Sequence, residues 1–230
     1  MYLHYIKNIL LFACKYILLS LIIFTMGIYL GYQVELNKNI NKQLLIEDVL
    51  NGNTDDLSYF LSNNNYNPNI YDDLGNPLLI LAIGRHHYNK TVIEILLNHG
   101  ANPNCSNYLG ITPLIRACDY GYLDITELLV KKGAMINQKD RFSKNTPLMW
   151  AIRSKHPLIV NFLIAHGANI NESNVDGETP LIYATMTNQP KIVMILLKKG
   201  ANPYIKDNEG RTALSLAEEY KIIGILKILR

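Results

Sequence analysis

A segment of about 33 residues recurs along most of the chain, and it constrains the fold more than any other feature. Four copies open on a Thr-Pro-Leu or Thr-Ala-Leu triplet, and successive triplets are 34, 33 and 33 residues apart. An alanine follows three residues after each leucine. Units of this length bury their apolar faces only against neighbouring units, so the chain is expected to form a continuous stack. The four triplets begin at Thr112, Thr146, Thr179 and Thr212.

Each unit has the pattern of two short helices. The threonine is suited to cap the first helix, and the proline after it suits a first turn in which the missing N–H has no cost. The second helix has apolar residues at i, i+3 and i+4, as in Ile159, Phe162 and Leu163. A glycine such as Gly167 then ends the helix in the left-handed conformation. The polar stretch that follows is typical of a hairpin finger that reaches the next unit.

This arrangement resembles the ankyrin repeat family over about residues 43 to 230. The resemblance implies an all-α fold, an ankyrin-repeat solenoid of about six units, each a helix-turn-helix plus a β-hairpin finger. A transmembrane helix is expected before it. The units are expected at approximately 43–70, 71–104, 105–137, 138–171, 172–204 and 205–230, the first and last acting as caps.

Several positions depart from the family pattern. The usual histidine after Thr-Pro-Leu is replaced by Ile115, Met149, Ile182 and Ser215, so its hydrogen bonds to neighbouring turns are expected to be absent. The leading unit has Asn65 where a glycine would stand, and the second has two extra residues around Arg85. The fourth finger has one extra residue, with Lys144 in the place of the turn glycine. Residues 139–145 are therefore expected to form the mobile or functional finger.

Residues 1–34 have the character of a membrane anchor, and residues 35–42 form a short linker. Nineteen residues without a charge run from Tyr16 to Val34. As a helix they would be about 28 Å long, close to the ~30 Å hydrocarbon core of a bilayer. The alternative is a cleaved signal peptide, which would release a secreted binding module. That reading needs a shorter apolar run and a better small-residue cleavage site.

The side of the membrane on which the repeats lie is left open by the flanking charges. Lys7 and Lys15 precede the apolar run, and Lys38 and Lys42 follow it, so the lysines balance. The free amino terminus tips the balance toward a cytoplasmic amino terminus. The prediction is a single-pass membrane protein whose repeats are extracytoplasmic.

Charge is distributed unevenly, although the net charge is only +3. That net charge gives no indication of nucleic acid as a partner. Residues 35–130 carry eleven acidic and five basic side chains, whereas residues 131–230 carry eight acidic and fifteen basic ones. The split fits either a solvated surface or a partner that has a charge polarity of its own.

The family resemblance implies that the chain binds a protein through its finger tips and the exposed ends of its first helices. Apolar side chains recur on successive fingers and suggest a contact stripe, or else they stack on one another between fingers. At another recurring position, Arg116, Trp150 and Tyr183 either stack across repeats, with the guanidinium over the indole, or pack into the core. The implied protein-binding residues are Leu74, Arg85, Tyr108, Leu109, Asp119, Tyr120, Arg141, Phe142, Arg153, Val175, Asp176, Met186, Asn208 and Glu209.

Catalysis is not predicted. The sequence has no glycine-rich phosphate loop after a strand, no HExxH and no paired CxxC, so we expect no catalytic residues, no cofactor and no metal site. His86 and His87 are adjacent in a loop, which is a poor arrangement for metal ligation. Cys105 and Cys118 are expected to be buried free thiols, or to pair in an oxidising compartment. A non-catalytic subunit of an enzyme complex remains as an alternative function.

Overall fold

The computed structural model of the protein describes residues 24–33, 41–63, 66–84 and 88–230. The chain divides into two compact units, residues 1–47 and 48–230, each of which is described by itself. The expected glycine replacement at Asn65 and the extra residues from Arg85 to His87 lie outside the described residues.

In the amino-terminal unit, residues 24–33 are helical, and a second helix begins at residue 41 and ends at residue 51, beyond the boundary at residue 47. The predicted membrane span covers residues 16–34, of which 16–23 and 34 lie outside the described part. No helix among the described residues combines the length and apolar character needed to cross a bilayer. The anchor therefore stays a prediction.

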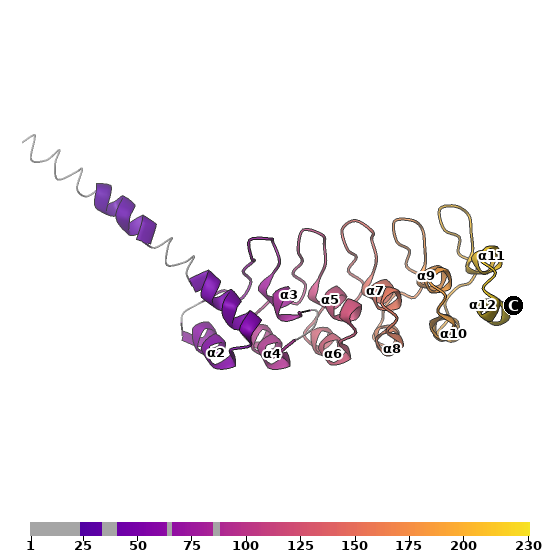
Figure 1. Cartoon of the computed structure of the whole chain (residues 1–230), viewed down its shortest axis with the longest axis horizontal. Coiled ribbons are helices and arrows are strands. Elements are labelled where there is room, and N and C mark those ends of the chain that lie inside the picture. Colours follow the sequence, from indigo (N-terminus) through magenta and orange to yellow (C-terminus); the bar gives the residue numbers. More distant parts are fainter. Residues whose placement is uncertain (1–23, 34–40, 64–65, 85–87) are drawn as a thin grey trace, which may run out of the picture. The chain divides into compact units, whose positions relative to one another are not determined.

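The unit of residues 48–230 consists of paired helices that follow one another along its length (Figure 1). In the described part of this unit, α2 is followed by five helix pairs. The bounds are α2 Thr54–Asn63, α3 Leu78–Ala82 with α4 Lys90–Asn98, α5 Pro113–Tyr120 with α6 Leu123–Lys131, α7 Pro147–Arg153 with α8 Pro157–Ala165, α9 Pro180–Met186 with α10 Pro190–Lys198, and α11 Ala213–Glu219 with α12 Ile223–Leu229.

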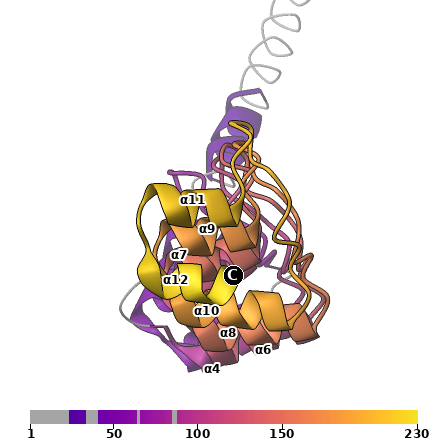
Figure 2. The same ribbon diagram turned by 90° about the vertical axis from the view of Figure 1, so that its right-hand side faces the viewer.

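The pairs form two layers of helices. First helices contact first helices from α3 through α5, α7 and α9 to α11, and α6, α8, α10 and α12 contact one another in a second layer. The view along the stack shows both layers, with the loops between pairs gathered on one side (Figure 2). Leu148, Met149 and Ile159 are among the fully buried side chains between the layers. The core is thus continuous from pair to pair, as the repeat pattern requires.

Threonine caps the first helix of four repeats, as predicted. The Thr112 hydroxyl accepts a hydrogen bond from the Ile115 amide at 3.1 Å, and Thr146 and Thr179 do the same in α7 and α9. Thr212 and Ser215 form a reciprocal capping box at α11. Such a cap satisfies an amide that the helix itself leaves unpaired.

The fingers are loops, and the prediction of β-hairpin fingers is wrong for the described residues. The isolated bridge between Tyr71 and Pro77 is the one strand-like pairing in a described finger. One backbone bond crosses the turn, as from the Asn107 amide to the Ile111 carbonyl at 3.2 Å, and a side chain takes the amides on the other side. The Asn107 carboxamide oxygen accepts from the amides of Leu109 and Ile111, both at 3.1 Å. Because the side chain takes these amides, no second ladder rung forms across the finger.

An asparagine ladder joins consecutive repeats at the other end of the finger loops. The Asn104 carboxamide donates to the Gly133 carbonyl at 3.1 Å and accepts from the Met135 amide at 2.7 Å. One side chain thereby satisfies both the end of α6 and the start of the next loop. Tyr204 stands at the equivalent place in the last loop, and its side chain is 83% exposed. The other rungs are made by Asn69, Asn137 and Asn171.

Candidate functional site

The finger tips carry a row of exposed apolar side chains. Because an asparagine or aspartate at the start of each finger turns the backbone amides inward, the next two side chains point outward. The exposed fractions are 74% for Leu74, 63% for Tyr108, 62% for Phe142 and 53% for Val175. We call these four residues the finger row. They lie on four successive fingers, as predicted, and are not stacked out of solvent.

Backbone hydrogen bonds tie neighbouring fingers together. The Arg141 amide donates to the Leu109 carbonyl at 2.9 Å, the Val175 amide to Ser143 at 2.9 Å, and the Asn208 amide to Asp176 at 3.0 Å. These three bonds hold four consecutive finger tips at a fixed offset. Leu109 is 37% exposed, which is less than the 63% of its neighbour Tyr108. Its side chain lines a groove described below.

The fourth finger is built around Asp140, whose side chain is 3% exposed. Its carboxylate accepts from the amides of Phe142, Ser143 and Asn145 at 2.8–3.2 Å, and from Trp150 Nε1 at 3.0 Å. Lys144 has φ of 56°, as expected for a residue in the place of the turn glycine. The finger presents Phe142 from a firmly bonded base, and its predicted mobility stays a prediction.

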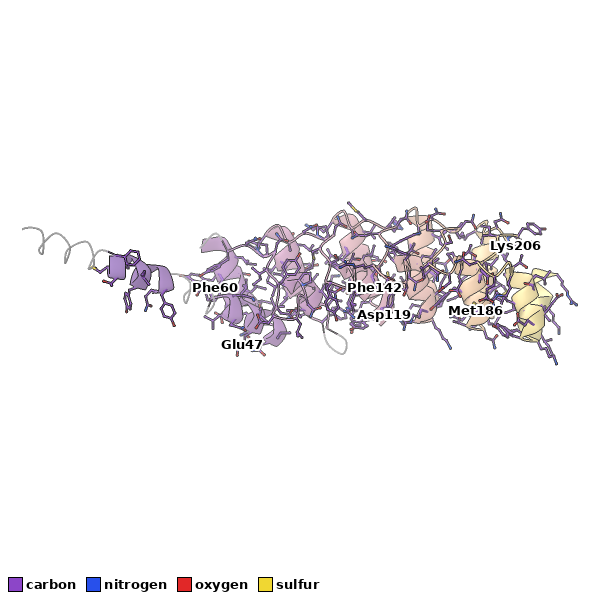
Figure 3. All side chains as sticks on the ribbon, turned by 90° about the horizontal axis from the view of Figure 1, so that it is seen from above. Glu47, Phe60, Asp119, Phe142, Met186 and Lys206 are labelled. Carbon is purple, nitrogen blue, oxygen red and sulfur yellow. The ribbon has the colours of Figure 1, made fainter. Side chains whose placement is uncertain are left out.

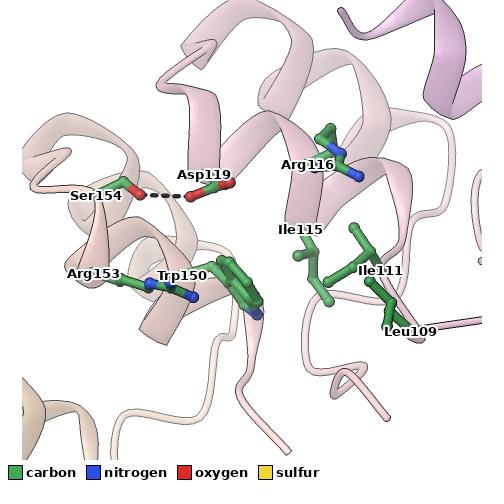
Figure 4. Close-up of a pocket in the computed structure, with 8 residues that line it drawn as sticks. All are labelled: Leu109, Ile111, Ile115, Arg116, Asp119, Trp150, Arg153 and Ser154. Carbon is green, nitrogen blue, oxygen red and sulfur yellow. Dashed lines mark hydrogen bonds between the residues drawn. The ribbon is translucent and has the colours of Figure 1, made fainter. Parts of the chain in front are cut away.

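A groove of about 400 Å³ lies between α5 and α7 on the side of the fingers (Figure 4). We call it the α5–α7 groove. The Asp119 carboxylate accepts from the Ser154 hydroxyl at 2.6 Å across it. The predicted residues Leu109, Asp119 and Arg153 meet here, which places finger and helix-end positions in one site. The lining residues are Leu109, Ile111, Ile115, Arg116, Asp119, Trp150, Arg153 and Ser154.

Of the two alternatives for Arg116, stacking of its guanidinium on Trp150 is not what the structure shows. Arg116 lies over the ring of Tyr120, 5.3 Å from its centroid, and donates to the Tyr120 hydroxyl at 3.1 Å. The guanidinium that lies over Trp150 is that of Arg153, 4.7 Å from the indole centroid. Side chains separated by three or four positions on one helix face are about 5–6 Å from each other, whereas the axes of neighbouring helices are about 8–10 Å from each other. Each arginine therefore contacts an aromatic ring on its own helix.

The remaining predicted residues divide between the groove side and the finger tips. Tyr120 packs edge-on against Tyr122, with ring centroids 5.8 Å apart, so its ring has a structural partner. Asp119 and Met186 lie along one long edge of the stack formed by residues 48–230 (Figure 3). Asp176, Asn208 and Glu209 are exposed on the last two fingers, and Arg85 lies outside the described residues.

The cysteines and histidines give no reactive centre in the described part of the chain. Cys105 and Cys118 are buried free thiols. Burial raises the pKa of Cys105 to about 12 and also raises the pKa of Cys118, so both stay protonated. His99 and His166 donate through Nδ1 to helical carbonyls at 2.8 Å. No described group of three His, Cys, Asp or Glu residues is placed to hold a metal ion, and His86 and His87 lie outside that part.

The family model for ankyrin repeats (three copies) matches residues 45–140 and 148–230. The chain belongs to the ankyrin repeat family. It is 35% identical to an ankyrin repeat protein of Fowlpox virus (strain NVSL) over 104 residues, which are 44% of this chain and 30% of that protein. It is 32% identical to the ankyrin repeat and KH domain-containing protein mask of Drosophila melanogaster over 105 residues, 44% of this chain and 2% of the relative.

A longer match joins the ankyrin repeats of this chain to an enzyme. The chain is 26% identical to a palmitoyltransferase of Homo sapiens over 182 residues, which are 64% of this chain and 28% of that enzyme. The chain spans less than a third of the length of each of these three relatives. The ankyrin repeats suggest a protein-protein interaction module.

Asparagine side chains link the fingers of these ankyrin repeats. The Asn107 carboxamide donates to Asn76 at 3.1 Å, and the Asn174 carboxamide donates to Asn145 at 3.2 Å. The family histidine is absent from the chain, and Ile115, Met149 and Ile182 are buried in its place. These links were not predicted from the sequence, although the recurring asparagine or aspartate that opens each finger was the available signal.

Proposed function

We propose that the chain is a non-catalytic, membrane-tethered module that holds a partner protein against the finger row and the α5–α7 groove. The observation that carries the proposal is the row of Leu74, Tyr108, Phe142 and Val175, four exposed apolar side chains on successive fingers. Apolar and aromatic anchors beside a groove are typical of protein interfaces. Ankyrin repeats suggest the same kind of function.

Removing two aromatic anchors tests the binding surface. Tyr108→Ala combined with Phe142→Ala is expected to weaken partner binding by up to about a thousandfold, since aromatic anchors at an interface contribute about 2 kcal/mol each. Both side chains are exposed, so the helix content should be unchanged. The partner is first captured with a photoreactive phenylalanine analogue in place of Tyr108, and its affinity is then measured for wild type and variant.

The matched control replaces two exposed apolar side chains of the second helix layer, Leu158→Ala with Met194→Ala. Their exposed fractions are 68% and 50%, so a similar apolar area is removed away from the fingers. The control should bind as wild type does. Equal affinity of the Tyr108/Phe142 variant and wild type would remove the finger row from the interface.

The membrane tether rests on the nineteen uncharged residues from Tyr16 to Val34. An apolar helix of that length matches the ~30 Å core of a bilayer. The full chain is expected to stay with vesicles in alkaline carbonate at its complete mass. Replacing Leu21 and Ile23 with lysine should release it, because a charge at the centre of a span costs about 3 kcal/mol. Extraction of the unmodified chain, or a mature chain shortened by the apolar run, would contradict the tether.

A further inference from the structure

The α5–α7 groove contains two guanidinium groups and one carboxylate. Arg116 and Arg153 both line it, and neither has a carboxylate partner among the described residues. The carboxylate is that of Asp119, and it is already engaged by the Ser154 hydroxyl at 2.6 Å. Arg141 adds a further cation on the next finger, where its amide donates to the carbonyl of Leu109 at 2.9 Å. The groove therefore holds an excess of positive charge that the chain itself does not neutralise.

Aromatic rings hold both guanidinium groups in place. Arg153 lies over Trp150, whose indole is in turn fixed by the hydrogen bond from Nε1 to Asp140. Arg116 is held by the ring and hydroxyl of Tyr120. A guanidinium has five N–H donors in a rigid plane, so stacking leaves most of them available to a ligand. Ordering the side chains in advance lowers the entropy cost of binding.

The floor of the groove is apolar. Ile111 and Ile115 are buried beneath it, and Leu109 forms the wall toward the fingers. On the next finger, the guanidinium of Arg141 lies 5.9 Å from the ring centroid of Phe142. A ligand that satisfies the whole groove must bring a carboxylate for the arginines and an apolar side chain next to it.

The acidic finger tips limit the length of the anionic ligand. Asp73 and Asp176 are exposed on fingers before and after the groove. A nucleic acid carries a phosphate at every step and would meet these carboxylates, whereas binding to a polyanion favours a continuous basic surface. A short segment with one or two carboxylates avoids them.

We propose that the α5–α7 groove receives a short acidic segment of the partner protein, with its carboxylates between Arg116 and Arg153 and an apolar neighbour on the floor. This inference rests on the proposed protein-binding function and names the chemistry of the segment bound. Arginine and carboxylate pair through two parallel hydrogen bonds, which gives the groove a preference for carboxylate over amide.

The test uses the full chain in nonionic micelles and three capped peptides of alternating valine with glutamate, glutamine or lysine. The chain has one tryptophan, Trp150, so its emission reports directly on the groove. We expect a saturable change with the glutamate peptide, and affinities at least about tenfold weaker for the other two, because only the carboxylate accepts two N–H bonds from each guanidinium. Added salt should weaken the binding of the glutamate peptide to the chain.

Two double variants with equal charge change then assign the site, with anisotropy of a labelled glutamate peptide as the readout. Arg116→Gln with Arg153→Gln is expected to lose about tenfold or more in affinity. Lys191→Gln with Lys198→Gln, on the exposed face of α10, should lose little affinity for the peptide beyond the general effect of the lower net charge.

Equal binding of glutamate and glutamine peptides, no binding of the glutamate peptide, or equal loss in the two double variants would each overturn the inference. So would tight binding of a phosphoserine peptide without binding of the glutamate peptide. None of these results touches the capture experiment at Tyr108, so the proposed function and the chemistry of the groove can fail separately.

Discussion

Gly110→Ala is expected to destabilise the repeats by about 3 kcal/mol, through strain and overlap together. Gly110 has φ of 76°, a conformation in which a side chain costs about 1–2 kcal/mol. A methyl group there would also lie 2.5 Å from the Arg141 amide nitrogen, which is much too close. That amide donates to the Leu109 carbonyl, so relief of the overlap breaks the bond between the third and fourth fingers. The measurement is the urea midpoint at unchanged m.

Gly75 provides a matched control for this effect. It has φ of 75° in the second finger, and a methyl group there would meet nothing within 4 Å. Gly75→Ala should therefore show only the conformational cost of about 1–2 kcal/mol. If the two variants lose the same free energy of unfolding, the close approach of the fingers does not contribute to stability. The bond between the third and fourth fingers would then not be what fixes the offset of their tips.

The repeat architecture was predictable because it follows from local rules. A threonine before proline caps a helix whatever surrounds it, and a helix that ends at glycine needs no tertiary contact to do so. Thr146 and Gly167 behave in the structure as these rules require. The order of helices and the number of pairs could therefore be read from spacing alone.

The links between repeats were harder to predict because one side chain competes for several partners. Asn107 closes its own finger and also donates to Asn76 of the preceding finger. The hairpin prediction failed for this reason, since the side chain uses amides that a strand ladder needs. The same competition explains Arg116, for which Tyr120 on its own helix was a nearer partner than Trp150 on the next.

The candidate site could be predicted in position but not in chemistry. Finger tips are exposed in any such stack, so the exposure of Tyr108 and Phe142 follows from the register of the repeats. The groove depends on which way long side chains turn. Arg153 faces it because the indole of Trp150 holds the guanidinium, and a sequence pattern does not specify that rotamer.

Asp140→Ala is expected to cost about 3 kcal/mol and to weaken partner binding, because one buried carboxylate supports both the fourth finger and the groove. Removing it leaves the Asn145 amide and Trp150 Nε1 without an acceptor, and an unpaired buried donor costs about 1–3 kcal/mol. The indole then no longer holds Arg153 in place, and the base that presents Phe142 loses two further bonds. Urea unfolding gives the stability, and Trp150 emission reports the released indole.

Two substitutions separate the buried hydrogen bonds of Asp140 from its charge. Asp176→Ala removes the same charge from the exposed tip of the next finger, where a surface change is expected to stay within about 0.5 kcal/mol. Asp140→Asn keeps one acceptor oxygen for Phe142 and Ser143 but turns a donor toward Trp150, so its stability should fall between wild type and Asp140→Ala. If Asp140→Asn is as stable as wild type, the indole hydrogen bond does not hold the groove. Equal losses for Asp140→Ala and Asp176→Ala would show that charge alone, and not the buried network, sets the stability of the finger.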